Sequence, residues 1–256
     1  MSLAGRCALV TGAGRGIGFE IARNLCAAGM RVALNDINIP ELERAVASLK
    51  TAGYGAYSMP GDVSKRADVE QIINEIEREI GPLWLLVANA GVFSAAPAVD
   101  FPEEEWDRTF ASDAKAVFLC SQAAARRMVT RSAGRIVVIS SIAGHIVRTG
   151  QIAYCAAKAA AIHFARCLAV ELASGGITVN CLCPGMTDSA MLRQTAEGRG
   201  IGIEDYLAMI PAGRLATAED HAQTILWLAS DAAQHVTGQV ISVDGGQSLY
   251  HPLTKG

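Results

Sequence analysis

Short apolar segments alternate with longer amphipathic segments along the whole chain. The short segments lie at residues 7–10, 31–34, 54–59, 84–87, 135–139, 177–180 and 239–243. Continuous apolar runs of this length are typical of strands that are covered on both faces, as in a parallel sheet. The pattern therefore predicts about seven strands in a mainly parallel sheet.

The segments between the predicted strands have helical periodicity. They lie at residues 16–28, 40–52, 65–80, 103–130, 151–174 and 218–229. Pro40 begins one helix, because proline is favoured in a first turn, and Ala218-Glu219-Asp220 places acidic side chains in another first turn. Repeated alternation of strand and helix implies right-handed crossovers. We therefore expect an α/β fold with a doubly wound sheet and helices on both faces.

Residues 186–213 interrupt this alternation. The segment contains four glycines and one proline, with only short helical patches. It follows the end of a predicted strand, which is where doubly wound sheets bind ligands. We interpret it as a mobile lid over a substrate, with a solvated surface excursion as the alternative. No linker or repeat divides the chain, so residues 1–256 are expected to form one domain.

Composition narrows the class of protein. The 256 residues are 51% hydrophobic and 18% charged, with a formal net charge of -3, so a large core can be buried. The absence of a basic block argues against nucleic acid or an anionic membrane as the main partner. No apolar run approaches the ~20 residues needed to span a bilayer. The first predicted strand begins at once, which leaves no room for a signal peptide.

The seven cysteines are odd in number and scattered through apolar segments. We therefore expect reduced thiols in a cytoplasmic protein rather than a disulfide framework. Cys181 and Cys183 stand two apart on a predicted strand, which places both thiols on one face. No other ligand is nearby in sequence, so a metal site is not expected.

A glycine-rich turn joins the first strand to the first helix. Its residues are Thr11-Gly12-Ala13-Gly14-Arg15-Gly16-Ile17-Gly18. Glycine allows a tight turn and lets the backbone approach a pyrophosphate, whose charge is favoured at a helix N-terminus. The GxxxGxG spacing in a strand-turn-helix context predicts a dinucleotide-binding turn.

An acidic residue, Asp36, ends the second predicted strand. A carboxylate here can accept hydrogen bonds from the adenosine ribose and would repel a 2′-phosphate. A simple helix cap is the alternative. Arg15 could instead bind that phosphate, but repulsion from Asp36 should outweigh it. The sequence therefore favours NAD over NADP.

Further motifs follow in chain order. They are Gly61-Asp62-Val63, Asn89-Ala90-Gly91, Ser140-Ser141, Tyr154-Cys155-Ala156-Ala157-Lys158, Asn180, Pro184-Gly185 and Val243-Asp244-Gly245-Gly246. Together with the glycine turn, this series resembles the short-chain dehydrogenase/reductase family over essentially the whole chain. Among its branches it looks most like the 3-oxoacyl-carrier-protein reductases and polyol dehydrogenases. The resemblance implies a Rossmann-type fold and hydride transfer between a nicotinamide cofactor and a secondary alcohol or ketone.

The residue types fit this chemistry. Tyr154 and Lys158 are four apart, so on a helix they lie on one face. A phenol has an unperturbed pKa of about 10, and a nearby ammonium favours its ionised form. Tyr154 can then serve as general acid and base. Ser141, on the loop after its strand, can hydrogen-bond the substrate oxygen.

The resemblance also implies which residues contact the cofactor and the substrate. The cofactor set is Gly12, Gly14, Arg15, Gly16, Ile17, Gly18, Asp36, Asp62, Val63, Asn89, Ala90, Gly91, Tyr154, Lys158, Pro184, Gly185 and Thr187. Asp62 and Val63 should flank the adenine, and Thr187 should lie near the carboxamide. The substrate set is Ser141, His145, Gln151, Tyr154 and Met186. For His145, a solvent-facing loop position is the alternative.

Asp113 departs from the family pattern, which usually has the asparagine of its catalytic tetrad here. In the family a backbone carbonyl at a helix kink holds a water that links the lysine to solvent, and any residue supplies a carbonyl. An unpaired buried carboxylate would be costly and would tend to gain a proton. We expect an active NAD(H)-dependent enzyme with Asp113 in the catalytic group.

Two other functions stay open at this point. They are an NADPH-dependent 3-oxoacyl-carrier-protein reductase and a cofactor-binding regulator without turnover. The resemblance further implies a homotetramer that pairs the helices predicted at 103–130 and 151–174.

Overall fold

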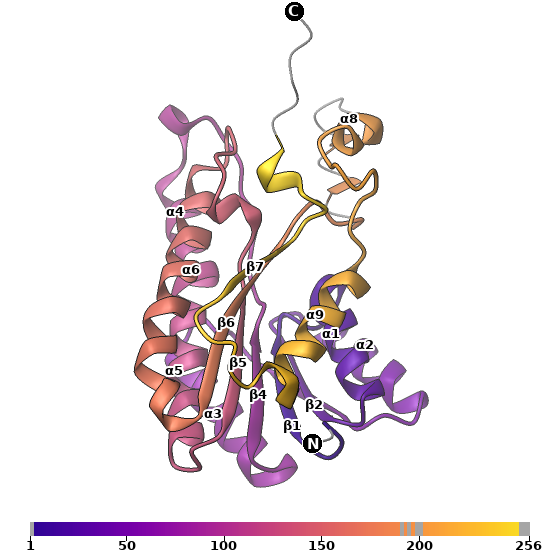
Figure 1. Cartoon of the computed structure of the whole chain (residues 1–256), viewed down its shortest axis with the longest axis vertical. Helices are drawn as coiled ribbons and strands as arrows, with labels where there is room; N and C mark the ends of the chain where they lie inside the picture. The colour runs from indigo at the N-terminus through magenta and orange to yellow at the C-terminus, as the bar shows by residue number, and fades with distance from the viewer. Residues whose placement is uncertain (1–2, 190–191, 194–195, 198–201, 251–256) are drawn as a thin grey trace, which may run out of the picture.

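Seven strands form one sheet in the computed structural model (Figure 1), which describes residues 3–189, 192–193, 196–197 and 202–250. The strands are β1 (Cys7–Thr11), β2 (Arg31–Asp36), β3 (Ala56–Pro60), β4 (Leu83–Ala88), β5 (Gly134–Ile139), β6 (Ile177–Pro184) and β7 (Val240–Val243). Their order is β3-β2-β1-β4-β5-β6-β7, and each neighbouring pair is parallel. The predicted doubly wound parallel sheet is confirmed.

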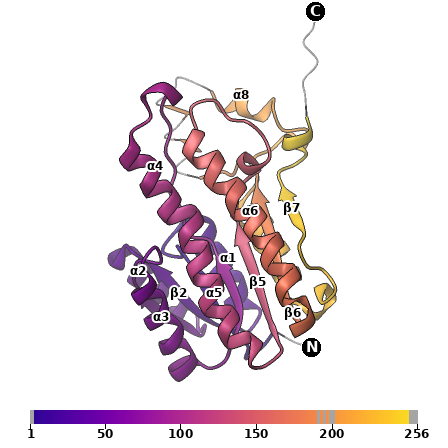
Figure 2. The same cartoon turned by 90° about the vertical axis from the view of Figure 1, so that its left-hand side faces the viewer.

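Helices cover both faces of the sheet, as Figures 1 and 2 show. One layer contains α1 (Gly16–Ala27), α2 (Ile39–Thr51) and α9 (Ala218–Ala229). The other contains α3 (Arg66–Glu75), α5 (Ala116–Val129) and α6 (Ile152–Leu172). Two shorter helices, α4 (Glu103–Phe110) and α8 (Ile203–Leu207), lie toward the end of the molecule where the strands finish.

The strands are apolar on both faces because each face has its own core. Along β1, Leu9 packs in the core under α3, α5 and α6, whereas Ala8 and Val10 pack in the core under α1, α2 and α9. Leu86 and Leu85 of β4 divide between the two cores in the same way. Successive side chains on a strand point to opposite faces, so a two-sided core requires continuous apolar runs.

The predicted helix starts are close to those observed. Helix α2 begins at Ile39, so Pro40 is its second residue, and Asn38 caps it by accepting a hydrogen bond from the Glu41 N–H. Helix α9 begins at Ala218 with a capping box formed by Thr217 and Asp220. The carboxylates in these first turns also interact favourably with the positive N-terminal end of the helix dipole.

Two helices predicted as continuous contain a π-helical turn. The 65–80 segment is α3 followed by η1 (Ile76–Ile80), and the 103–130 segment is α4, then η3 (Ala111–Lys115), then α5. Turns of this type often mark functional sites, and η3 contains Asp113. Strand β6 continues to Pro184, four residues beyond its predicted end.

One helix is long and apolar enough to cross a membrane by length and composition. It spans Ile152–Gly175, with a mean hydropathy of 1.2. The expectation that no apolar stretch approaches bilayer length is therefore wrong. Burial on the sheet accounts for part of this composition: 39% of the apolar window is buried, and small side chains such as Ala153, Ala157 and Ala161 lie along its inner face, beside the charged Lys158.

The structure describes part of the segment predicted to be a lid, residues 186–189, 192–193, 196–197 and 202–213. Thr187 pairs with Ala216 in an isolated parallel bridge. Helix α8 lies between these two residues in the sequence. Helix α8 packs Tyr206 inward, with 6% of its surface exposed. Gly198 and Gly200 lie outside the described residues, and the lid itself stays a prediction.

Candidate active site

Four predicted catalytic residues lie beyond the carboxyl end of β5 and on the helices beside it. Ser141 follows β5, Tyr154 and Lys158 stand on the first two turns of α6, and Asp113 stands on η3. The Lys158 Nζ atom is 5.5 Å from the centroid of the Tyr154 ring. Ser140 donates a 2.8 Å hydrogen bond to the Lys158 carbonyl, which ties the serine loop to α6.

Lys158 and Asp113 form a buried ion pair. The Lys158 Nζ atom is 3.0 Å from Asp113 Oδ2, and the two side chains are 5% and 0% exposed. Asp113 Oδ1 accepts a 2.7 Å hydrogen bond from the Val92 N–H, and Lys158 also reaches the Ile139 carbonyl at 3.4 Å. Asp113 is therefore not the unpaired buried carboxylate that was considered from the sequence.

Gly91 makes room for this pair. A Cβ atom at that position would lie 3.0 Å from Asp113 Oδ2 and 3.1 Å from Lys158 Nζ. Both contacts are tighter than ordinary van der Waals packing, so a side chain here would press on both charges. Gly91 thus helps the catalytic charges to meet, in addition to its predicted place beside the cofactor.

The ion pair determines the charge state of Lys158. Burial by itself lowers the pKa of the ammonium, but attraction to Asp113 and Tyr154, together with the hydrogen bond to Asp113, outweighs burial and raises the pKa above its usual value. Lys158 is therefore protonated at neutral pH. Asp113 offsets part of the positive charge that Lys158 presents to Tyr154.

Tyr154 is oriented by a neighbour that the sequence did not reveal. Its ring contacts Phe93 edge to face, with centroids 5.3 Å apart. Such pairs have a preferred geometry that restricts the phenol. Ser141 is the cap of a short 3-10 turn, where its hydroxyl accepts a 3.1 Å hydrogen bond from the Ala143 N–H. The same oxygen keeps its proton available for another acceptor.

The glycine turn fits a pyrophosphate by its own packing. Gly12 has a φ of +63°, and a Cβ atom there would lie 2.9 Å from Ala90 Cα. A Cβ atom on Gly18 would lie 2.2 Å from the Gly12 carbonyl oxygen. Helix α1 begins at Gly16 without a side-chain cap and without an acidic residue in its first turn. Its N–H groups, with Ile17 beside them, suit an anion.

Asn89 holds this turn in place. Its amide donates to the carbonyls of Thr11 at 2.9 Å and Gly12 at 3.1 Å. The Thr11 hydroxyl in turn accepts hydrogen bonds from the N–H groups of Asn89 and Ala90, each at 3.0 Å. The predicted motif at the end of β4 is thus joined directly to the glycine turn after β1, which is its neighbour in the sheet.

Asp36, at the end of β2, contacts the glycine turn. Its Oδ2 accepts a 2.9 Å hydrogen bond from the Gly14 N–H, and its Oδ1 accepts one of 2.9 Å from the Asn38 N–H. The cap of α2 is Asn38, so the alternative of Asp36 as that cap is wrong. Arg15 lies near another acid, with its Nε 3.5 Å from Glu41 Oε2.

The residues predicted to flank the adenine, Asp62 and Val63, are held by local contacts. Asp62 Oδ1 accepts hydrogen bonds from the N–H of Ser64 at 3.0 Å and its hydroxyl at 2.7 Å. These bonds and the attraction of Lys65 outweigh burial, which acts in the opposite sense, and lower the pKa of Asp62. Val63 is buried in the core.

The residues predicted to contact the nicotinamide lie at and just after the end of β6. Pro184 ends the strand, and the Gly185 N–H donates to the Val243 carbonyl at 3.0 Å. A Cβ atom on Gly185 would lie 2.5 Å from the Asp244 Cβ, so only glycine fits. The Met186 N–H donates to the side chain of Gln247 at 3.1 Å. Gln247 was not anticipated, although it follows the Val243-Asp244-Gly245-Gly246 motif.

Thr187 directs its hydroxyl into the protein. Its Oγ1 lies 3.0 Å from the Gly185 carbonyl oxygen and 2.9 Å from His221 Nε2. His221 is completely buried on α9, and burial lowers its pKa to about 4, with Asp220 acting weakly in the opposite sense. Sequence reasoning missed His221, because a lone histidine in a helix has no motif.

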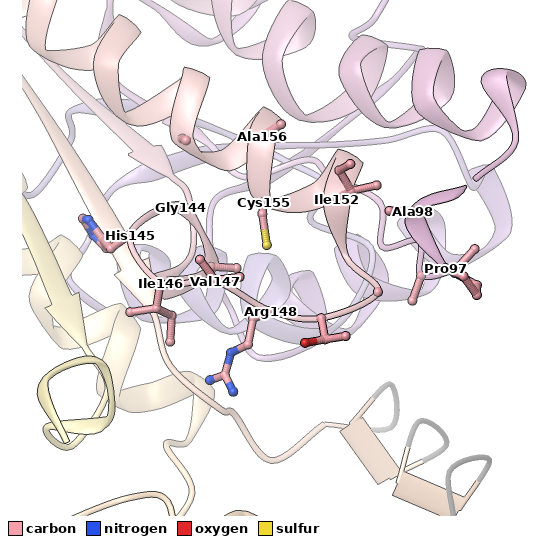
Figure 3. A pocket seen from close by; sticks show the side chains of 16 residues that line it. Pro97, Ala98, Gly144, His145, Ile146, Val147, Arg148, Ile152, Cys155 and Ala156 are labelled. Carbon is pink, nitrogen blue, oxygen red and sulfur yellow. The ribbon is translucent and has the colours of Figure 1, made fainter. Parts of the chain in front are cut away.

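The predicted substrate residues are distributed around the loop between β5 and α6. His145 is exposed and borders a cavity of about 960 Å³, and its contact with substrate stays a prediction. This cavity (Figure 3) is also lined by Cys155, Ala156 and Ala159. These residues lie on the face of α6 opposite Tyr154, so the cavity is beside the catalytic residues rather than over them.

Cys181 and Cys183 lie on one face of β6 with their sulfurs 4.0 Å apart, as their spacing predicts. All seven cysteines are free thiols. Within the described residues, no group of three or more histidine, cysteine or acidic side chains is arranged to hold a metal ion.

Comparison with known proteins defines the family. Residues 12–248 match the family described as enoyl-(acyl carrier protein) reductase. The chain is 37% identical over 255 residues to 2,3-dihydro-2,3-dihydroxybenzoate dehydrogenase of Bacillus subtilis (strain 168), covering 96% of this chain and 97% of that protein. The chain belongs to the short-chain dehydrogenase/reductase family. Its members named here are dehydrogenases or reductases, and this chain is an NAD(P)-dependent enzyme of that kind, acting on CH–OH or keto groups.

Two further relatives of this dehydrogenase/reductase extend the comparison. The 3-oxoacyl-(acyl-carrier-protein) reductase FabG of Salmonella typhimurium is 37% identical over 250 residues, covering 97% of this chain and 100% of FabG. The crystal structure of a gluconate 5-dehydrogenase from Burkholderia cenocepacia J2315, in complex with NADP and tartrate, superposes with a TM-score of 0.91. It is 32% identical and covers 97% of each chain.

Replacing Asp113 with asparagine should move the pH–rate profile. The substitution removes the negative charge 3.0 Å from Lys158 Nζ, so the lysine charge then acts on Tyr154 without compensation. We expect a folded enzyme whose rising limb for alcohol oxidation shifts by about one pH unit toward acid. The measurement is kcat/KM against pH. Asp107→Asn, on the exposed side of α4, is the control and should leave the profile in place.

An unchanged profile, or a shift toward alkali, would contradict this electrostatic role for Asp113.

His221 should make the fold sensitive to acid. Its pKa is about 4 in the folded protein against an ordinary 6.5, so between these values the unfolded chain binds a proton that the folded chain does not. The free energy of unfolding therefore decreases as pH falls from 6.5 toward 4, by about 3 kcal/mol from this residue. Urea unfolding at pH 7, 6 and 5, as about three points across that range, measures the slope.

His221→Gln should flatten this slope, and the exposed His235→Gln should not. Equal slopes in wild type and His221→Gln would show that other groups cause the acid sensitivity.

Proposed function

We propose that this protein is an NAD(H)-dependent oxidoreductase that interconverts a secondary alcohol and a ketone, with Tyr154 as the general acid and base. The observation that carries the proposal is the position of the Lys158 ammonium, 5.5 Å from the Tyr154 ring and held there by Asp113. The free thiols agree with a cytoplasmic location, and we propose one domain for the whole chain, with residues 186–213 as its lid.

In this proposal each catalytic residue has a separate task. Tyr154 takes the hydroxyl proton of the alcohol, or returns a proton to the ketone, and Lys158 stabilises the ionised phenol between these events. Ser141 donates its hydroxyl proton to the substrate oxygen and fixes that oxygen near Tyr154. The nicotinamide, when bound, accepts or supplies the hydride. Gln151, His145 and Met186 are proposed to contact the rest of the substrate.

Asp113 and its π-helical turn support the proton path. The turn brings the Asp113 side chain against Lys158 while leaving backbone carbonyls of η3 outside the α-helical pattern. A carbonyl of this kind can hold a water between Lys158 and solvent. Aspartate can therefore stand in place of asparagine without loss of the relay. This argues against the regulator without turnover.

NAD is proposed as the preferred cofactor. Asp36 ends β2 and accepts a hydrogen bond from Gly14 of the glycine turn, and the neighbouring Arg15 has Glu41 as a partner, so this region has two acidic side chains and one basic side chain. Such a balance disfavours a 2′-phosphate. The proposed cofactor contacts at Asp62, Asn89, Pro184 and Thr187 are common to either cofactor.

The second candidate is an NADPH-dependent 3-oxoacyl-carrier-protein reductase. The 37% identity to FabG favours it. The relative crystallised with NADP and tartrate likewise shows that the other cofactor occurs among close folds. Asp36 is the residue on which the two candidates differ.

We also propose assembly as a homotetramer through α4, α5 and α6. These helices carry exposed apolar side chains that a partner copy would cover. They are Trp106, Phe118, Val129, Ile152 and Val170.

Replacing Tyr154 with phenylalanine tests the proposed function. The variant keeps the ring that packs on Phe93 but loses the hydroxyl that moves the proton. We expect kcat for alcohol oxidation to fall at least 100-fold, about the contribution of general acid–base catalysis, while NADH binding followed by fluorescence persists. Retention of more than about a tenth of the wild-type rate would reject Tyr154 as the acid and base.

Replacing Asp36 with serine tests the cofactor preference. Loss of the carboxylate removes the repulsion of a 2′-phosphate and leaves Arg15 able to meet it. We expect the ratio of kcat/KM for NAD to that for NADP to fall by roughly 10-fold or more. Glu43→Gln, an exposed change of the same charge on α2, is the control. Wild-type preference for NADPH over NADH would contradict the argument from repulsion.

A further inference from the structure

Arg148 lies on the loop between Ser141 and Tyr154, and its charge has no partner in the part of the chain that the structure describes. It is half-buried and borders the cavity beside α6 (Figure 3). No hydrogen bond or ion pair involves its guanidinium within the described residues. The segments that fall outside them contain no aspartate or glutamate.

The loop that carries Arg148 is fixed at both ends. The Gln151 N–H donates to the Arg148 carbonyl at 3.2 Å, and the Ala96 N–H donates to the Gly150 carbonyl at 2.9 Å. Ser141 on one side and α6 on the other are tied together by Ser140. These bonds hold the backbone that carries Arg148 in a fixed place between Ser141 and α6.

The guanidinium lies between the catalytic loop and the segment proposed as a lid. Figure 3 shows its side chain extending from the loop on the side away from α6. The groups that act on it electrostatically are Cys155 of α6 and Tyr206 of α8, a thiol and a phenol rather than carboxylates. Burial lowers the pKa of Arg148, as expected for a cation without a counterion, although arginine stays charged in proteins.

Other arginines in this region have partners. Arg193 pairs with Asp188 at 2.7 Å, and Arg214 pairs with Asp220 at 2.7 Å. The acid nearest the end of β7, Asp244, accepts hydrogen bonds from the N–H groups of Gly246 and Ser248. These three carboxylates are therefore occupied elsewhere, and a half-buried guanidinium without a carboxylate partner is costly unless a ligand supplies the anion.

We propose that Arg148 binds a carboxylate on the substrate, so that the enzyme acts on a hydroxy acid or oxo acid rather than on a neutral alcohol. This rests on the proposed function, because the reacting carbon must lie at Ser141 and Tyr154. Guanidinium is suited to the task, since its planar N–H groups form two parallel hydrogen bonds to one carboxylate. Arg148 acts as a binding residue, and the α8 segment covers the bound anion.

The test uses matched pairs of probes that differ only in the anionic group. The pairs are D-gluconate with D-glucitol, and 3-hydroxybutyrate with butane-1,3-diol, each oxidised in the presence of NAD. The variants are Arg148→Gln and Arg148→Lys. Arg78→Gln, an exposed arginine on η1, is the control for net charge.

We expect the wild-type enzyme to prefer the carboxylated member of at least one pair. Arg148→Gln should reduce kcat/KM for that acid roughly 10- to 100-fold, mainly through KM, and should change the neutral member less than about twofold. Arg148→Lys should retain an intermediate affinity, because it keeps the charge without the planar fork. Arg78→Gln should behave as wild type.

Calorimetric titration of the same acids into the NAD-loaded protein separates this inference from the proposed function. Binding of an acid that is lost in Arg148→Gln supports the carboxylate site even if no probe is oxidised, a result that would overturn the proposed function alone. Equal loss for acid and neutral probes in Arg148→Gln, a preference for the neutral member of each pair, or no acid binding to wild type would overturn the inference.

Discussion

Parallel strand pairing is the constraint on which the rest of this structure depends. All seven strands run the same way, so their carboxyl ends lie along one edge of the sheet. Connections must return over the faces, which is why helices cover both sides and the strands are apolar throughout. The loops at that edge are then free to differ, and the glycine turn, Asn89, Ser141 and Gly185 all lie there. The candidate functional residues are therefore concentrated at the carboxyl ends of the strands.

Charge at the centre of the site is balanced inside the protein. Lys158 is buried, and a buried ammonium would ordinarily tend to lose its proton. Attraction to Asp113, 3.0 Å away, and to Tyr154 raises the pKa of Lys158 against the effect of burial, and Asp113 is itself held by the Val92 N–H. The family's asparagine is neutral, so aspartate here adds a second charge that both fixes the lysine and moderates its effect on Tyr154. The space for this arrangement comes from Gly91.

Charge at the outer side of the site is not balanced in the same way. Arg148 is half-buried with no acid beside it in the described chain, whereas Asp36 accepts two backbone hydrogen bonds at the end of β2. An anionic group on the substrate and a neutral ribose on the cofactor would complement these two charges. Both proposed preferences rest on single residues, Arg148 in a loop and Asp36 at the end of β2.

The sequence by itself determined the sheet, the helices and the main chemistry, because each depends on the pattern of residues within a short segment of the chain. Apolar runs bounded by turns defined all seven strands, and the Tyr154-Lys158 spacing placed both side chains on one helical face. Only the tertiary structure decided which partners these residues meet. The pairing of Asp113 with Lys158, the contact of Thr187 with His221 and the isolation of Arg148 join or separate residues that are distant in the chain. Such contacts leave no periodic signal, because they arise when the sheet brings its loops to one edge and burial selects the partner of each charge.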